Sequence, residues 1–121
     1  MHHLAPCFFA LAAAALVAGC GPSADALVSE GIQRAIAGDT EAALATFERA
    51  LERDDEHPAA LYNAGLAELL LGRPERALEH LRRLAELHPD DARTLHLLAR
   101  AFVLLDRREE AIGALQRSVE A

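Results

Sequence analysis

Four histidines in the C-terminal part of the chain are the side chains that most readily suggest a metal site. They are His57, His80, His88 and His96, and the last three are eight residues apart. A metal site on a helix needs ligands three or four residues apart, so that they share one face. The helices expected below place His80 on one helix, His88 at its end and His96 on the next helix, so these side chains point in different directions. We therefore expect no metal site and no cofactor.

The sequence also lacks the arrangements that are typical of catalysis. We identify no Ser-His-Asp arrangement, no glycine-rich phosphate loop and no pair of buried carboxylates. The acidic runs at 54–56, 90–91 and 109–110 lie between helical stretches or at their starts. Carboxylates at those places cap helix N-termini and interact favourably with the helix dipole. We expect a protein that is not an enzyme.

Composition favours one small helical domain that does not bind nucleic acid. The chain has 121 residues, a net charge of −7, and 52% hydrophobic but only 4% aromatic residues. Ala and Leu, both strong helix formers, dominate, which predicts an all-α fold. Every basic residue is Arg, and these arginines alternate with Glu instead of forming a basic stripe. A nucleic acid is therefore a poor candidate partner.

The first 19 residues have the pattern of an export signal. Residues 4–19 are apolar and uncharged, and a Gly-Pro-Ser run follows at 21–23. The apolar stretch is shorter than the roughly 20 residues that a membrane-spanning helix needs. An uncleaved anchor helix and a buried core helix are the alternative interpretations. Both cysteines, Cys7 and Cys20, belong to this part of the chain, so the repeat region contains neither a disulfide nor a Cys-based zinc site.

The end of this segment resembles a bacterial lipobox. Val17-Ala18-Gly19-Cys20 places an aliphatic residue and two small residues before a cysteine. The resemblance implies a lipoprotein signal peptide over 1–19, lipidation of Cys20 and a short linker over 20–23. The protein would then be anchored in the bacterial cell envelope by acyl chains. Gly21 after the cysteine implies the outer membrane, facing the periplasm, if the source is Gram-negative. The start, Met1-His2-His3, departs from the pattern because it has no Lys or Arg.

The remaining residues repeat with a period of 34. The alignment pairs Leu27 with Leu61 and Leu95, Gly31 with Gly65 and Ala99, Ala43 with Ala77 and Ala111, and Phe47 with Leu81 and Leu115. Apolar residues within each unit follow helical spacing, with a break near the middle of the unit. We expect first helices over 24–37, 58–71 and 92–105, and second helices over 40–53, 74–87 and 108–121. Breaks at 38–39, 72–73 and 106–107 separate the two helices of each unit.

These residues resemble the tetratricopeptide repeat family. The middle unit, 58–91, matches best, with small residues at Gly65 and Ala77, a turn glycine at Gly72 and a terminal proline at Pro89. The resemblance implies an all-α solenoid of three helix-turn-helix repeats, that is, six antiparallel helices over 24–57, 58–91 and 92–121, after the N-terminal signal segment. The first unit lacks the terminal proline. The third has Asp106 in place of the turn glycine, where we expect a left-handed backbone because Asp tolerates it.

The resemblance also implies a concave groove lined by the first helix of each unit. The candidate groove residues include an apolar group and a basic group: Val28, Ile32, Tyr62, Asn63, Leu66, Arg93, His96 and Arg100. Tyr62, Arg93 and Arg100 are the strongest candidates, because aromatic residues and Arg are enriched at binding hot spots. An apolar helix or extended segment that carries a carboxylate would fit such a groove. Leu69, Leu70 and Val103 also occupy groove positions, with packing against neighbouring helices as the alternative.

A carboxylate clamp of the Hsp90-binding kind is not expected. It requires a basic residue and an Asn on the first helix, where this chain has Val28 and Ile32. Only Asn63 and Arg93 match clamp positions, and Leu97 does not.

The last repeat is expected to present an exposed apolar edge. Ile112 and Val119 lie at positions that would face a following repeat, and no polar capping helix follows. The leading hypothesis is an envelope-anchored adaptor that binds an unknown protein or peptide partner in its groove. The alternative is a self-associating structural module that completes its solenoid through this edge, for example as a homodimer.

Overall fold

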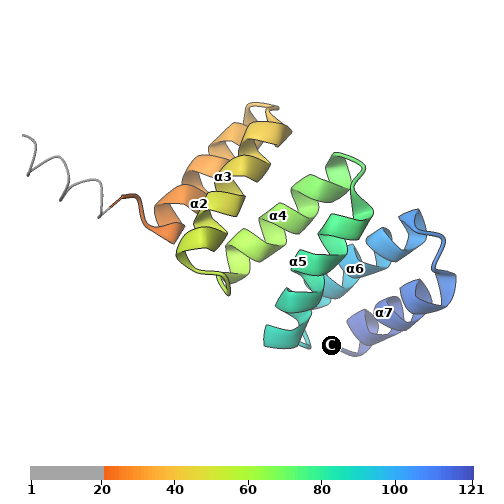
Figure 1. Ribbon diagram of the computed structural model, residues 1–121. Coiled ribbons are helices and arrows are strands. Elements are labelled where there is room, and N and C mark those ends of the chain that lie inside the picture. Colours follow the sequence, from red (N-terminus) through yellow and green to blue (C-terminus); the bar gives the residue numbers. More distant parts are fainter. Residues whose placement is uncertain (1–20) are drawn as a thin grey trace, which may run out of the picture.

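The computed structural model describes residues 21–121, which form six α-helices and no strands (Figure 1). The helices are α2 (Ala24–Ile36), α3 (Thr40–Arg53), α4 (Pro58–Leu70), α5 (Pro74–Leu87), α6 (Ala92–Leu104) and α7 (Arg108–Glu120). Each boundary lies within one residue of the expected one. The all-α fold of three helical hairpins is confirmed. The signal segment and Cys20 lie outside the described residues.

Side chains at the expected positions start several of the helices. Ser23 Oγ accepts a hydrogen bond from the Ala26 backbone N–H at the start of α2, and Asp39 Oδ1 accepts one from Ala42 at the start of α3. Asp91 caps α6. These oxygens satisfy N–H groups that have no partner within the helix. The acidic run at 90–91 therefore has the capping role that its position predicts.

The turn inside each of the three hairpins has a left-handed backbone at the same repeat position. Gly38, Gly72 and Asp106 stand 34 residues apart and have φ values of 87°, 73° and 56°. Glycine adopts this backbone without steric cost, and Asp tolerates it better than most other residues. The expectation of a left-handed backbone at Asp106 is confirmed.

The first helices of the units form an inner layer and the second helices an outer one. Within residues 21–121, α2 packs on α4 and α4 on α6, whereas α3 does not reach α5 and α5 does not reach α7. The contacts therefore place α2, α4 and α6 on the inner side of the array, whose three hairpins follow one another in chain order in Figure 1. We call the surface that these three helices present the inner surface.

Close packing within each hairpin depends on small residues of the first helix. A Cβ at Gly65 would lie 2.7 Å from Cγ and Cδ2 of Leu81, and a Cβ at Gly31 would collide with the ring of Phe47. Ala99 holds the same position in the third unit and is buried. Among residues 21–121, the buried core residues lie between Leu27 and Ala114. Residues 21–121 thus contain their own core, and we expect them to fold without the first 20 residues.

Candidate protein-binding groove

The inner surface exposes most of the residues that the sequence predicted to line a groove. Ile32, Arg93, His96 and Arg100 are exposed, and Tyr62, Asn63 and Leu66 are half-buried. Each of them lies on a first helix. They form the candidate binding surface.

Val28 is the exception, and its assignment to the groove was wrong. Its side chain is only 6% exposed and belongs to a core cluster with Leu27, Ala50 and Ala60. Tyr62 is at the equivalent position of the second unit, where its longer side chain remains partly accessible. The short Val28 side chain is covered because α4 packs against α2.

An aliphatic row marks the carboxyl ends of the first helices. Ile36, Leu70 and Leu104 stand 34 residues apart and are 74%, 62% and 57% exposed. Val103 beside the row is also exposed, whereas Leu69 is buried. Packing therefore explains Leu69 but not Leu70 or Val103. Since water-exposed aliphatic side chains at three equivalent positions stabilise no core, the row offers an apolar contact strip.

A cleft of about 550 Å³ lies at the opposite, amino ends of α4 and α6. We call it the amino-end cleft; it is lined by Pro58, Ala59, Tyr62, Asn63, Leu84, His88, Asp91 and Arg93. The guanidinium of Arg93 lies 5.6 Å from the centre of the Tyr62 ring, a cation–π contact. The sequence predicted Tyr62, Asn63 and Arg93. It did not predict the side of the cleft that Leu84, His88 and Asp91 form. These residues lie beside the predicted ones because α5 runs antiparallel to α4, so that the end of α5 lies next to the start of α4.

The polar groups of the amino-end cleft are suited to hydrogen bonding with a ligand. Asn63 donates from Nδ2 to the Ala59 carbonyl at 2.8 Å, which leaves its amide oxygen to accept. The Thr94 hydroxyl donates to Asp91 at 2.6 Å and holds the pKa of that carboxyl below its ordinary value. Asp91 is thus a carboxylate at neutral pH, 3.7 Å from Nε of Arg93. His96 and Arg100 lie farther along α6 and do not line this cleft.

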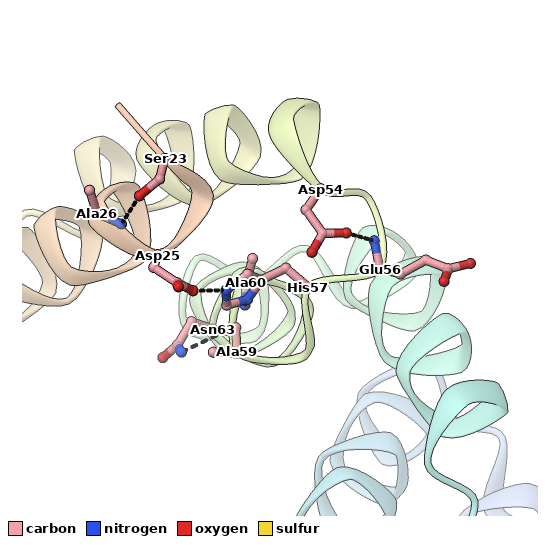
Figure 2. A network of polar contacts seen from close by, with 9 residues as sticks. All are labelled: Ser23, Asp25, Ala26, Asp54, Glu56, His57, Ala59, Ala60 and Asn63. Carbon is pink, nitrogen blue, oxygen red and sulfur yellow. Dashed lines mark hydrogen bonds and ion pairs between the residues drawn. The ribbon is translucent and has the colours of Figure 1, made fainter. Parts of the chain in front are cut away.

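A histidine cap connects the first unit to the second (Figure 2). Nδ1 of His57 accepts a hydrogen bond from the Ala60 backbone N–H at 3.2 Å, at the start of α4. A neutral ring with this acceptor carries its proton on Nε2, which lies 2.6 Å from Oδ1 of Asp25 on α2. This role was not predicted from the sequence, because histidine is an unusual capping residue.

Helices α4 and α5 hold a carboxylate–imidazole pair, Glu68 and His80, of which only the carboxylate is fully buried. Glu68 is 1% exposed, and its Oε1 lies 3.0 Å from Nδ1 of His80. Oε2 of Glu68 has no hydrogen-bond partner among the described residues. The contact with Glu68 raises the pKa of His80, against the effect of burial. The sequence missed this pair, since the first and third units have Arg34 and Phe102 in place of Glu68.

Two further observations concern metal and membrane. Within residues 21–121 no group of three or more His, Cys, Asp or Glu side chains is placed to hold a metal ion. Nor is any described helix long and apolar enough to span a membrane.

Comparisons with known proteins agree on the repeat. Two family models, both described as tetratricopeptide repeat, match residues 34–92 and 68–121. A search of the curated proteins gives no match.

Solved structures with the same fold include two whose descriptions mention a peptide or a peptide-binding site. MamA from Desulfovibrio magneticus RS-1, residue 41 to the end, is 30% identical with a TM-score of 0.77, over 81% of this chain and 55% of that one. YrrB, described as having an unusual peptide-binding site, is 19% identical with a TM-score of 0.78, over 83% and 52%.

The second repeat domain of Spaghetti, bound to the HSP90 peptide SRMEEVD, is 17% identical with a TM-score of 0.78, over 81% of this chain and 91% of that domain. The chain spans about half the length of the MamA structures that it matches.

Proposed function

The chain belongs to the tetratricopeptide repeat family, and we propose that it is an interaction module that binds a segment of another protein along its inner surface. The observation that carries this proposal is the aliphatic row, Ile36, Leu70 and Leu104, which stays exposed on the first helix of each of the three units. Apolar side chains of a partner would bury this row, and burial of apolar surface is the main driving force of association.

The amino-end cleft adds polarity and direction to this surface. Tyr62 and Leu70 are eight residues apart on α4, so the cleft and the row are separated by about 12 Å along the helix axis. A partner segment of about eight helical or four extended residues spans that distance. We propose a segment with apolar side chains over the row and a carboxylate or hydrogen-bonding group near Asn63 and Arg93. The Arg93 side chain is 80% exposed, so it can turn toward such a group from its contacts with Tyr62 and Asp91.

Site-specific photocrosslinking tests this proposal. A photoreactive residue at Leu70 probes the inner surface, and the same residue at the exposed Arg49 of α3 serves as the matched outer control. We expect one or a few discrete crosslinked proteins from Leu70, strongly reduced when Tyr62→Ala and Arg93→Ala are combined. Equal crosslinking from both positions, or no effect of the double substitution, would refute binding at the inner surface.

We further propose that Cys20 carries a lipid anchor that holds the solenoid at a bacterial envelope membrane, the outer membrane if the source is Gram-negative. The support is the lipobox-like run Val17-Ala18-Gly19-Cys20. Helix α2 begins at Ala24, so only three residues, at most about 10 Å of chain, separate it from Cys20. The role would be an adaptor that presents the inner surface close to the membrane.

The substitution Cys20→Ser tests the anchor. We expect it to block removal of residues 1–19 and to abolish lipid labelling of the protein. Unchanged processing and membrane fractionation would show that the chain is not a lipoprotein, and would leave the binding proposal intact.

A further inference from the structure

Helix α7 presents an apolar face that no other described residue covers. Ile112, Leu115 and Val119 are 55%, 40% and 85% exposed. They line a shallow depression of about 370 Å³ together with Gln116 and Glu120. We call Ile112, Leu115 and Val119 the α7 face.

The repeat shows what this face does elsewhere in the molecule. Leu44 and Leu78, equivalent to Ile112, are 3% and 4% exposed, and Phe47 and Leu81, equivalent to Leu115, are 1% and 0% exposed. The second helix of each earlier unit packs against the first helix of the next unit, α3 on α4 and α5 on α6. The α7 face is therefore built for helix packing, and a further helix would bury it.

The opposite end of the solenoid does not complement this face. Ala64 and Ala67 of α4 pack in the core cluster with Leu44 and Phe47 of α3. Their equivalents on α2 are Glu30 and Gln33, both accessible, and Glu30 forms an ion pair with Arg34 at 2.7 Å. Head-to-tail stacking of two copies would press the Glu30 carboxylate against the α7 face. Burying a charge there without a partner is costly, so an open chain of copies is disfavoured.

Two α7 helices complement each other when they run antiparallel. Arg108 lies one turn before Ile112 on the same side of the helix, and Glu120 lines the depression at the other end. An antiparallel pair that sets Ile112 against Val119 places the Arg108 end of each copy beside the Glu120 end of the other, with the two residues offset by about 4.5 Å along the helix axis, and also aligns the helix dipoles favourably. A parallel pair would oppose like charges. Arg108 forms an ion pair with Asp106 in the single chain. Both side chains are highly exposed, so this pair competes little with a pair between two copies.

We propose that two copies of this chain associate through the α7 face, with the two helices antiparallel about a two-fold axis near Leu115 and Gln116. Ile112 of one copy then lies against Val119 of the other. Such an interface is closed, so it gives a dimer and not a fibre. Three apolar side chains make a small interface, and we expect a dissociation constant on the order of 10–100 µM.

Sedimentation of residues 21–121 over a wide concentration range tests the association. We expect the average mass to rise toward that of a dimer, and Ile112→Glu to keep the protein monomeric throughout. Ile36→Glu, which replaces another exposed isoleucine at the other end of the molecule, is the control and should leave the association unchanged. Circular dichroism verifies that both variants fold. A wild-type monomer at every concentration overturns the proposal.

Cysteine crosslinking tests the antiparallel arrangement, since residues 21–121 contain no cysteine. A tagged Ile112→Cys chain is mixed with an untagged Val119→Cys chain and oxidised. We expect mixed disulfides to exceed both homodisulfides. A predominance of homodisulfides would overturn the antiparallel arrangement, and crosslinking of Ile112→Cys to Ala26→Cys on α2 would indicate head-to-tail stacking instead.

Charge exchange gives a second readout. Arg108→Glu and Glu120→Arg should each weaken the dimer severalfold, and the double exchange should restore it. Failure of the double exchange to restore association would exclude the proposed cross-pairs. Neither outcome affects the proposed function, because Arg108 and Glu120 lie away from the inner surface.

Discussion

The middle and last units follow the same repeat pattern but differ in how their second helices are covered. Leu81 on α5 is completely buried, whereas its equivalent on α7, Leu115, is 40% exposed. Helix α6 packs on α5, and no described helix packs on the far side of α7. The sequence pattern of one unit therefore defines a packing face, while burial of that face depends on the next unit.

The two units also differ at the position that Glu68 and Phe102 share. The middle unit buries a carboxylate beside His80. The last unit buries an aromatic ring, with the guanidinium groups of Arg107 and Arg82 at 5.1 Å and 5.7 Å from its centre. One fold position thus accepts either a charged pair or an aromatic ring with cations. The charged pair makes the middle unit sensitive to pH.

Alanine at the equivalent leucines should produce the largest contrast. Leu81→Ala leaves a cavity among α4, α5 and α6, and we expect a loss of about 2–5 kcal/mol in the free energy of unfolding. Leu115→Ala removes a side chain that is already partly in water, so we expect a loss of about 1 kcal/mol. Urea unfolding of residues 21–121 at low concentration measures both. Equal losses would mean that the α7 face is covered in solution.

Substitution of alanine for two helical glycines should change the stability of the protein in opposite directions. Both substitutions gain about 1 kcal/mol of helix propensity. At Gly65 the added Cβ meets Leu81 at 2.7 Å, and overpacking of this kind costs about 1–3 kcal/mol, so we expect net destabilisation. At Gly113 the Cβ meets nothing within 4 Å, and we expect the stability to rise by about 0.5–1 kcal/mol. The same unfolding experiment decides. A stabilising Gly65→Ala would show that α4 and α5 can separate at little cost.

The sequence predicted the helices and their turns well because the repeat shows each feature three times. Gly38 and Gly72 identify the left-handed position that Asp106 also occupies. Features that occur in only one unit are not repeated in the sequence, so they could not be predicted in this way. The buried pair of Glu68 and His80 has no counterpart in the other units, and the cap at His57 uses a residue type that rarely caps helices.

The candidate site was only partly predictable for the same reason. Tyr62, Asn63 and Arg93 follow from their positions in the repeat. His88 and Asp91 come from the end of α5 and the turn after it, and only the antiparallel return of that helix brings them to the amino-end cleft. The burial of Val28 depends on how closely α4 approaches α2, which a single helix pattern does not specify.

Substitutions at the turn residues of the middle and last units should cause smaller changes in stability. Asp106→Gly relieves a left-handed non-glycine residue, and we expect the stability to rise by up to about 1 kcal/mol. Gly72→Ala places a Cβ at φ 73°, and we expect a loss of about 1 kcal/mol. Thermal unfolding of the two variants provides the measurement. A loss of stability in Asp106→Gly would indicate that the exposed ion pair between Asp106 and Arg108 matters more than the backbone strain.

The smallest predicted difference between the middle and last units is in how their stability depends on pH. The pKa of His80 is raised above its ordinary value of 6.5, chiefly by the contact with Glu68, with further contributions from Glu48 and Glu79. The folded protein therefore binds this proton more tightly than the unfolded chain does. The resulting stabilisation is complete below pH 6.5 and is lost as the pH rises through the raised pKa.

We expect His80→Gln to abolish that part of the fall in stability with rising pH, and His96→Gln, at an exposed position on α6, to retain it. Urea unfolding at a series of pH values, plotted as the difference between wild type and variant, isolates the contribution of His80 from those of the other histidines. The last unit has Phe102 and Ala114 at the positions of Glu68 and His80, so it contributes no such pH-dependent stabilisation. A difference curve that is flat between pH 5 and pH 9 would show that Glu68 and His80 are not coupled in the folded protein.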